Sequence, residues 1–384
     1  MDGGSYWHNG LERCLRYAFR CLSTHRTISL NINIDGMQVF NNGKNQMWPI
    51  LGNVHEEPSV AVFLVAVYYG LHKPKRVQTF LEQFTMEYEN LIDTGLVING
   101  NLLTIKHRVF ICDSPARAFC KGVVSYNGRW GCIKCMVQRT EDRLTKIKSY
   151  QVEEAPLRTD ADFRLLTVYG DHHQKEKVAG RPGFHTVVSP LMRLNIDFIH
   201  SFITSDTLHL LHHGVMKCFL SGFLNGSRGR IKWQSAQIND LDRILNEVKL
   251  PCEMNRQIRP LSAMAHWKGT EFASFLNYVG VVILQNFIED CDLMSLKYLH
   301  VAVKICSNKY YRNHLPLARK YFRKFIVQYH DKTKTITSNI HLLTHVVDEV
   351  ELYGPLPTIS TYSFENILSQ LKKKLNRVDV PCNS

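Results

Sequence analysis

The stretch ISLNINID, residues 28–35, alternates apolar and polar residues and ends in Asp35. Strict alternation over this length is typical of a β-strand with one face buried. A second stretch, LLTIKHRVFICD, residues 102–113, passes from alternation to a continuous apolar run before Asp113. Such a run is typical of a central strand, covered on both faces. Hard divalent cations bind oxygen ligands, so two aspartates held at strand ends predict a divalent-metal site.

The composition excludes a disordered chain and favours an anionic partner. The chain has 384 residues, enough for two domains or for one domain with a large insertion. With 45% hydrophobic and 21% charged residues, it lacks the bias of a disordered sequence. The formal net charge of +13 favours nucleic acid as the partner.

Cysteine usage indicates a reducing compartment. The cysteines number eleven, an odd count for a disulfide framework, and most lie in apolar runs. The first residues, MDGGSYWHNGLERC, lack the basic region and apolar core of a secretory signal. No apolar run approaches the roughly eighteen uninterrupted residues of a membrane span. We therefore expect an intracellular protein that does not cross a membrane.

Periodicity gives an order of elements for the first third of the chain. The remaining strand patterns are interpreted as a hairpin followed by a third apolar strand, and helical spacing appears before and after them. That order, three strands, a helix, a strand ending in aspartate and another helix, is the order of the ribonuclease H-like fold. The first and fourth strands of that fold carry its first two metal carboxylates. The segments are helices at 11–22, 76–92 and from Ser114 onward, a hairpin of 37–40 with 47–54, and a strand at 59–70.

The rest of the chain is predicted to be loop-like at first and then helical. Residues 122–190 contain Gly, Pro and His with scattered charge, and they include Cys132 and Cys135. Helical spacing continues from about 236 to 350. After a break at YGPLPT, a last helix carries Glu365 in its first turn, beside an apolar stripe.

Several segments, taken in order, resemble the DDE transposases of the En/Spm (CACTA) type and the related transposase-domain proteins of animals. The resemblance extends from about residue 28 to 375, and several motifs in sequence make it more specific than any one of them. It implies an α/β fold: a ribonuclease H-like mixed sheet with flanking helices, interrupted by a large all-helical insertion. The segments are NIDGMQVF, NQMWPILG, YYGLHKPK, VFICDSPARAFCKG, GCIKC, VSPL, DTLHLLHHGVMK, HWKGTEF and YSFENILSQLKKKL.

The resemblance and the helical pattern together predict domain boundaries. Residues 1–25 are an N-terminal helical segment, and residues 26–220 are the ribonuclease H-like core, with a cysteine-containing loop region at 122–190. Residues 221–354 are the all-helical insertion, and residues 355–384 supply a C-terminal helix that completes the core. Family members usually carry a separate DNA-binding segment upstream. Only thirty-four residues precede Asp35, so a shortened copy is one interpretation.

The family's catalytic site uses two aspartates and a glutamate to hold two Mg²⁺ or Mn²⁺ ions for phosphoryl transfer. Carried over by position, the first aspartate is Asp35 and the second is Asp113. The glutamate is Glu365, in the helix after the insertion, with Glu271 in HWKGTEF as its rival. Without the family, Asp35 before Gly36 reads as a turn residue and Asp113 as a helix cap. Glu365 then reads as an acid favoured by the helix dipole.

Cys132 and Cys135 have the spacing with which two thiolates bind one tetrahedral zinc ion. Two further ligands are needed. Asp206 and His209 resemble the family's second ligand pair, and His185 is a further candidate. The alternative is a pair of loop cysteines without metal. The expected cofactors are therefore two Mg²⁺ or Mn²⁺ ions, with one structural Zn²⁺ left open.

Basic clusters supply two groups of candidate DNA contacts. One lies in the glycine-containing loop GSRGRIKW, where cations can reach phosphates and an indole can stack on an unpaired base. The other follows Glu365 on its own helix and is expected to neutralise phosphates beside the cut strand. The basic cluster at 319–324 is instead interpreted as a solvated helix face. The candidates are Arg228, Arg230, Lys232, Trp233, Lys372, Lys373 and Lys374.

The expected function is that of a DDE-type DNA transposase catalytic domain in the nucleus. It would cleave DNA at transposon ends and join the freed 3′-hydroxyl to target DNA, in a reaction that depends on divalent metal. Two alternatives stay open: a transposase-derived, catalytically silent DNA-binding or assembly protein, and a stand-alone ribonuclease H-like nuclease. The expected partner is DNA, with no membrane, and self-association into a homo-oligomer is left open.

Overall fold

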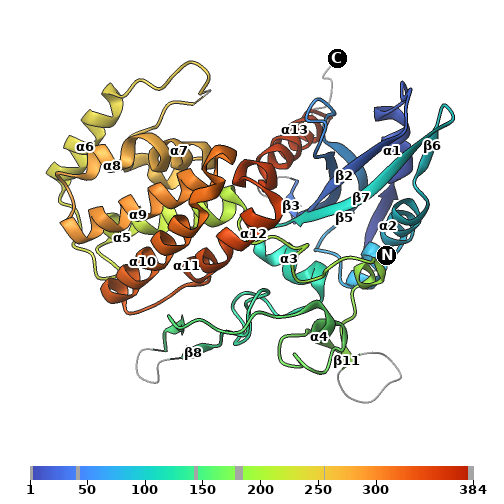
Figure 1. Ribbon diagram of the computed structural model, residues 1–384. Helices are drawn as coiled ribbons and strands as arrows, with labels where there is room; N and C mark the ends of the chain where they lie inside the picture. The colour runs from blue at the N-terminus through green and yellow to red at the C-terminus, as the bar shows by residue number, and fades with distance from the viewer. Residues whose placement is uncertain (1–2, 40–43, 142–145, 178–184, 255, 379–384) are drawn as a thin grey trace. The chain divides into compact units, whose positions relative to one another are not determined.

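The computed structural model of the chain has two compact units (Figure 1). The first unit comprises residues 1–136, 156–203 and 361–384, and the second comprises residues 137–155 and 204–360. The domain boundaries expected from the sequence stay a prediction. The structure describes residues 3–39, 44–141, 146–177, 185–254 and 256–378, with side chains up to Leu375.

A mixed β-sheet is the centre of the first unit (Figure 1). Its strands are β1 Gly4–His8, β2 Arg26–Ile34, β3 Met37–Gln38, β4 Gln46–Val54, β5 Phe63–Gly70, β6 Leu96–Ile98 and β7 Asn101–Ile111. The strand order is β1-β5-β4-β2-β7-β6, and β3 pairs with β4 as the predicted hairpin. Phe40, at the end of that hairpin prediction, lies outside the described residues. Because β2 runs antiparallel to β4 and parallel to β7, the prediction of an α/β fold with a mixed sheet is confirmed.

The middle strand β2 is more deeply buried than its alternating pattern predicts. From Leu30 onward its polar positions are covered as well, and both Asn31 and Asn33 are buried. The side-chain amide of Asn33 donates to the carbonyl of Ile111 at 2.7 Å, and that of Asn31 donates to Asn53 at 2.9 Å. The prediction of a half-buried strand is wrong for this part of β2, because its polar positions are covered as well and the side-chain amide N–H groups of Asn31 and Asn33 have hydrogen-bond partners.

Helices pack on the sheet through apolar faces. They are α1 Leu11–Ala18, α2 Val77–Thr94 and α3 Ser114–Lys121. In α2 the buried residues recur at helical spacing, and Phe80, Phe84 and Tyr88 belong to the same core as the sheet. The helices predicted at 11–22 and 76–92 are confirmed, although the first of them ends at Ala18.

His107 lies on β7 beside α2 and carries no charge at neutral pH. Its Nδ1 lies 3.0 Å from the hydroxyl oxygen of Tyr88. Its Nε2 is buried without a hydrogen-bond partner. Burial lowers the pKa of His107 from 6.5 to about 3, since the charged imidazolium would lose its hydration there.

Acidification is expected to destabilise the fold through His107. The unfolded chain binds a proton at this imidazole below about pH 6.5, whereas the folded chain binds one only near pH 3, so stability falls between these values. At pH 5 the expected loss from this group is up to about 2 kcal/mol. Urea unfolding at pH 7 and pH 5 checks this: His107→Gln should lose less stability than the unaltered chain. Equal losses would contradict the prediction.

The segment 198–203 extends the sheet at the carboxyl end of β7. Phe202 bridges Phe110 of β7 in parallel orientation. Lys121 and Arg117, both buried, donate hydrogen bonds to carbonyls at the two ends of this segment. The amine of Lys121 also packs against the faces of aromatic rings, which attract a cation. The segment is therefore fixed beside β7 by one parallel bridge.

The region predicted to be loop-like, 122–190, contains only short elements in its described residues. The pair β8 and β9 belongs to the second unit, and the other elements belong to the first. They are β8 Arg139–Glu141, β9 Lys148–Tyr150, α4 Asp160–Arg164, β10 Lys175–Glu176 and β11 His185–Thr186.

The described residues between 204 and 360 form helices and no strand. The helical spacing predicted from about 236 to 350 is therefore confirmed. None of the helices that the structure describes is both long and apolar enough to cross a membrane. The main elements are a π-helix Thr207–Met216, α5 Lys217–Asn225, α6 Ser235–Glu247, α7 Gly269–Ser274, α8 Gly280–Leu284, α9 Asp290–Cys306, α10 Leu315–Thr333, α11 Ser338–Leu342 and α12 Val346–Tyr353.

The segment 204–360 has its two ends joined by hydrogen bonds. Thr207 Oγ1 near its start lies 2.7 Å from Ser360 Oγ at its end. Glu349 of α12 is buried, and its carboxylate accepts hydrogen bonds from the backbone N–H and the hydroxyl of both Thr204 and Ser205. The start of this segment is therefore tied to its last helices.

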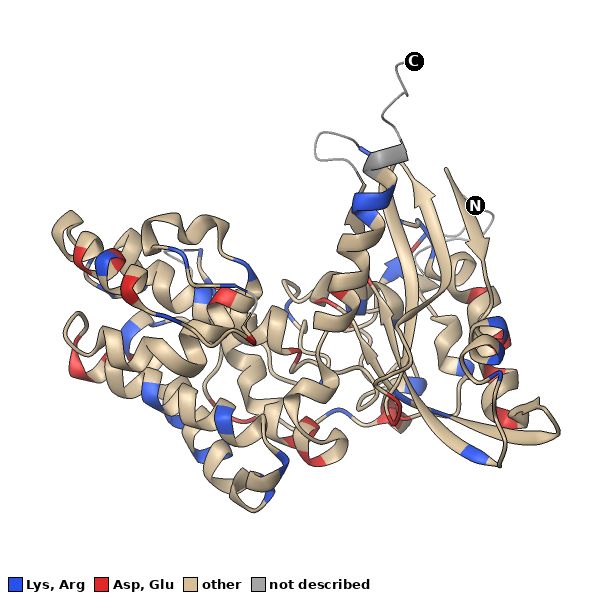
Figure 2. Cartoon of the chain, turned by 90° about the horizontal axis from the view of Figure 1, so that it is seen from above, with Lys and Arg blue, Asp and Glu red and all other residues tan. Residues whose placement is uncertain are grey.

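The chain returns to the first unit in α13 Tyr362–Val378. This helix lies beside the sheet in both Figure 1 and Figure 2. Phe364 and Leu368 are buried and give it an apolar face at helical spacing. The predicted last helix is confirmed, and Glu365 lies in its first turn.

Candidate metal centres

Asp35 and Asp113 follow neighbouring parallel strands at the same edge of the sheet. Asn33 of β2 pairs with Ile111 of β7, so each aspartate comes shortly after a paired position. Asp35 is 8% exposed, and its Oδ1 accepts the N–H of Gly36 at 2.7 Å. Ligand sites of α/β sheets lie beyond the carboxyl ends of the strands. The two carboxylates therefore belong to one edge that suits a ligand.

Asp113 is also the N-cap of α3. Its Oδ1 accepts the backbone N–H of Ala116 at 2.7 Å, which stabilises the start of the helix. The cap engages Oδ1, so Oδ2 is the candidate metal ligand. Burial raises the pKa of the Cys120 thiol on α3, the Cys112 thiol raises it further, and the negative charges of Asp113 and Asp35 add to this. Both aspartates are therefore close enough to act on one thiol.

Glu365 meets Asp35 although the two are far apart in the sequence. The N–H of Glu365 donates to the carbonyl of Thr361 at 2.9 Å, which places it in the first turn of α13. One carboxylate oxygen of Glu365 and one of Asp35 lie within 4.8 Å of each other. Two negative charges at this distance repel by about 3 kcal/mol at an effective dielectric constant of about 20. A bound divalent cation would offset that repulsion.

Asp113 is not part of this close group. In the part of the chain that the structure describes, no oxygen of Asp113 lies within 4.8 Å of both Asp35 and Glu365. Its cap to Ala116 holds one oxygen toward the helix start. The structure thus brings Asp35 and Glu365 together and places Asp113 between the end of the adjacent strand β7 and the start of α3.

Glu271, the rival glutamate, is committed to other contacts. It is buried at the start of α7, where its carboxylate accepts hydrogen bonds from Arg259 Nε at 2.7 Å and from the N–H of Lys268 at 2.8 Å. Burial would raise the pKa of Glu271, but the hydrogen bonds from Arg259 and from the backbone lower it below its usual value. Both of its oxygens accept hydrogen bonds from Arg259 or from the N–H of Lys268 just before α7. This favours Glu365 over Glu271 as the third carboxylate.

Cys132 and Cys135 lie in a buried loop of the first unit. Each is 2% exposed, and their Sγ atoms are 3.6 Å apart. Between them, the side chain of Lys134 donates to the carbonyl of Ile199 at 2.9 Å. The loop that presents the two sulfurs is therefore anchored to the segment 198–203.

His341 and His345 lie one helical turn apart in the second unit, at the end of α11 and just after it. Both are buried, and their ring centroids are 5.2 Å apart. Residues four positions apart on a helix share a face. Tyr150 of β9 stacks on His341 with a centroid distance of 4.8 Å and fixes the plane of that ring.

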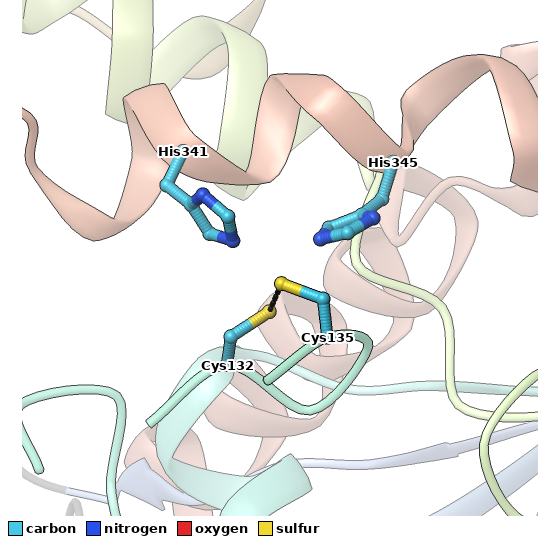
Figure 3. Close-up of side chains that lie close together, drawn as sticks. All are labelled: Cys132, Cys135, His341 and His345. Atoms are coloured by element: carbon cyan, nitrogen blue, oxygen red, sulfur yellow. Dashed lines mark hydrogen bonds between the residues drawn. The ribbon is translucent and has the colours of Figure 1, made fainter. Parts of the chain in front are cut away.

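Figure 3 shows Cys132, Cys135, His341 and His345 with their ligand atoms turned toward one another. One ligand atom from each residue lies within 4.8 Å of the others, and all four side chains are buried. Two thiolates and two imidazoles are a ligand set typical of structural zinc. The chain thus has a Cys₂His₂ group that could bind a metal such as zinc.

The residues that complete this group differ from the ligands expected to complete the cysteine pair, Asp206, His209 and His185. Asp206 is buried at the start of the π-helix, where it accepts the N–H groups of Leu208 and His209. Its Oδ2 also lies 2.6 Å from Nδ1 of His209. Asp206 therefore caps a helix, and His185 of β11 belongs to no ligand group among the described residues.

The sequence signal for this histidine pair is the motif HLLTH, which contains His341 and His345. The helical spacing predicted from about 236 to 350 includes this motif. Its i, i+4 spacing is that of two metal ligands on one helix face.

Two of the residues predicted to contact DNA are buried. Arg230 has a side chain that is 1% exposed, and its Nε lies 3.1 Å from Oδ1 of Asp292. Trp233 stacks on Phe223 with a centroid distance of 4.8 Å and donates its indole N–H to the carbonyl of Phe287 at 3.0 Å. The prediction that Arg230 reaches a phosphate and Trp233 a base is wrong, because both belong to the core of the second unit.

Arg230→Met is expected to destabilise the second unit by about 3 kcal/mol, because it removes the closer and more deeply buried of the two cations paired with the buried carboxylate of Asp292. Arg228→Met is the matched control, since Arg228 is exposed in the same loop and should change stability by less than about 0.5 kcal/mol. Urea unfolding followed by circular dichroism measures both. Equal stabilities of the two variants would refute the structural role of Arg230.

The other predicted DNA contacts remain accessible. Arg228 and Lys232 are exposed on the loop before α6. On α13, Lys373 and Lys374 are exposed and Lys372 is half-buried. Lys372 comes about two helical turns after Glu365 on the same face, roughly 10 Å along the axis. These residues stay predictions as phosphate contacts.

No protein-family model matches the chain, and no match was found among curated proteins. Any assignment of function therefore depends on the geometry of the two candidate metal centres and on the motifs of the sequence.

Proposed function

We propose that the chain is the catalytic core of a DDE-type DNA transposase, which cleaves DNA at transposon ends and joins the freed 3′-hydroxyl to target DNA. The observation that carries this proposal is the approach of Glu365 to Asp35 within 4.8 Å. A helix that follows the long helical segment 204–360 brings a glutamate back to an aspartate at the sheet edge. Asp113 belongs to the same edge, at the end of the adjacent parallel strand.

The order of strands supports a ribonuclease H-like core. The antiparallel strands β5, β4 and β2 are followed in the sheet by β7, which is parallel to β2. The segment 198–203 bridges β7 in parallel orientation as a fifth position. On this proposal the helical residues 221–354 are an insertion between that fifth position and α13.

Two Mg²⁺ or Mn²⁺ ions fit the donor set of this edge, which offers carboxylate oxygens, while the thiols of Cys112 and Cys120 are buried. Asp35, Asp113 through Oδ2, and Glu365 would hold them. Once bound, such ions activate a water or a 3′-hydroxyl and stabilise the leaving oxygen. The chain itself positions the three carboxylates on β2, β7 and α13. Lys372 is placed to neutralise a phosphate near them.

The Cys₂His₂ group is assigned a structural Zn²⁺ on the same proposal. Four N and S ligands complete a tetrahedral shell, so the ion keeps no open position for a substrate. DNA as the partner and the nucleus as the location follow from the proposed reaction. The net charge of +13 agrees with a polyanionic substrate.

The test is a strand-joining assay with Mn²⁺. A labelled duplex with an exposed 3′-hydroxyl is incubated with the protein and supercoiled plasmid, and covalent transfer of the label to the plasmid is measured. Transfer that depends on metal supports the transposase.

The same assay separates the two alternatives. Nicking of the plasmid without transfer of label would indicate a stand-alone nuclease. Binding of the duplex without cutting or joining would indicate a catalytically silent DNA-binding protein. Either outcome would overturn the proposed function.

A further inference from the structure

Residues 293–330 contain no aspartate or glutamate, although they include eight lysines and arginines. Other stretches also lack acids, residues 207–239 among them, but none is as long, and Figure 2 shows Lys and Arg beside Asp and Glu on many helices. A run of this length without an acid concentrates positive charge on the elements that it forms. Those elements are α9, a 3₁₀ turn at Lys309–His314 and α10.

The elements α9 and α10 form a helical hairpin within the second unit. Ser295 Oγ donates to Gln328 Oε1 at 2.7 Å, and the rings of Tyr298 and Tyr321 have centroids 5.3 Å apart. The connecting turn carries Tyr310 on its surface. We call residues 293–330 the acid-free hairpin.

Two of its cations are neutralised by acids from neighbouring segments. Arg319 pairs with Asp348 at 2.6 Å and with Glu351 at 3.1 Å. Arg323 pairs with Glu154 at 2.9 Å. The earlier interpretation of 319–324 as a solvated face therefore suits these arginines only in part, since each has an acidic partner.

The remaining cations form no ion pair with any residue that the structure describes. Their charge is therefore available to a polyanion. They are Lys297, Lys304, Lys309, Arg312, Lys320 and Lys324.

Tyrosine rings orient three of these lysines at the surface. Lys304 Nζ lies 4.4 Å from the ring centroid of Tyr278, and Lys324 Nζ lies 5.0 Å from that of Tyr298. Lys309 lies in the same way over its neighbour Tyr310, which is 80% exposed. Such a surface can make two kinds of contact with a phosphate chain. The lysines supply positive charge, and the tyrosine hydroxyls supply hydrogen bonds.

We propose that the acid-free hairpin binds the phosphate backbone of duplex DNA, as a holding surface within the second unit. The proposal rests on the proposed function, because DNA is the substrate there. A helix the length of α9 extends about 25 Å. Duplex DNA presents one charge per about 1.7 Å of its axis, so a duplex of that length carries more phosphates than the hairpin has unpaired cations.

The test removes four charges in Lys304→Gln, Lys309→Gln, Lys320→Gln and Lys324→Gln combined. The matched control removes four exposed cations elsewhere, in Arg20→Gln, Lys106→Gln, Lys249→Gln and Arg256→Gln combined. Binding of a fluorescent duplex of 30 base pairs is titrated in EDTA, from 50 to 200 mM KCl. Thermal unfolding of each variant shows whether the fold is kept.

The hairpin variant should bind the duplex at least about tenfold more weakly at 100 mM KCl. The slope of log affinity against log salt should become shallower by about 3.6, because each of the four lost phosphate contacts removes roughly 0.9 from it. The control should keep the slope of the unaltered protein. Equal slopes for the two variants would overturn the proposal. The proposal would also be overturned if poly-glutamate of equal charge competed for the protein as well as the duplex does. The surface would then recognise negative charge and not the phosphate backbone.

These outcomes are independent of the joining assay. An altered slope with no strand joining keeps the holding surface and rejects the transposase. Strand joining with an unaltered slope rejects the holding surface alone.

Discussion

Asp35→Asn is expected to abolish metal-dependent nicking and joining while the fold is kept. Asparagine has the shape of aspartate but lacks the charge that holds a divalent ion. Losing several kcal/mol of charge stabilisation in the transition state corresponds to a rate loss of roughly 10³-fold or more. Initial rates of nicking with Mn²⁺ measure the effect.

Stability should move in the opposite direction to activity in this variant. Asp35 and Glu365 carry like charges within 4.8 Å of each other, so neutralising one of them relieves repulsion in the metal-free protein. Asp35→Asn should therefore unfold at the same temperature as the unaltered chain or at a higher one. If the role of Asp35 were only structural, its replacement would lower the unfolding temperature of the protein.

Glu271→Gln is the matched control, because it changes a buried glutamate whose carboxylate pairs with Arg259 at 2.6 Å. It should lower the unfolding temperature and leave the nicking rate per folded molecule unchanged. If Glu271→Gln abolished nicking in a folded protein while Asp35→Asn stayed active, the assignment of the carboxylates would be refuted.

Removal of metal from the Cys₂His₂ group is expected to cause the largest loss of stability. Structural zinc in small domains contributes on the order of 10 kcal/mol to folding. The protein as purified should contain one zinc per chain, measured by mass spectrometry of the metal. Cys132→Ser should lose that zinc and unfold at a clearly lower temperature.

Cys252→Ser is the control for this change, since Cys252 is an exposed free cysteine. It should keep both zinc and stability. Retention of one zinc per chain by Cys132→Ser, or its absence from the unaltered protein, would contradict the zinc assignment. His341→Ala should repeat the effect of Cys132→Ser, because it removes another ligand of the same group.

The local pattern of the sequence is sufficient for the elements that carry the aspartates. Alternating and continuous apolar runs predict β2 and β7, because side-chain burial on a strand follows its period of two. The registry that sets Asp35 beside Asp113 then follows from parallel pairing. The alternating pattern does not predict the burial of Asn31 and Asn33, because that burial depends on hydrogen-bond partners on other strands.

Contacts between distant segments are what the sequence could not predict. Arg230 and Trp233 have the composition of a DNA-binding loop, yet tertiary packing places them in the core of the second unit. His341 and His345 carry a local signal, their spacing, but nothing local connects them to Cys132 and Cys135 some two hundred residues earlier. In both cases the role of a residue depends on the side chains that it contacts, and those side chains are far away in the sequence.

The hydrogen bond between Thr207 and Ser360 has a consequence for chain entropy. If residues 204–360 were a flexible loop, bringing its ends together would cost about 4 kcal/mol beyond a constant term. This segment folds with its ends already joined. Packing in its own core and the hydrogen bonds of Glu349 therefore offset the loss of chain entropy. Glu365 can then reach Asp35 as though the two flanking segments were linked by a short turn.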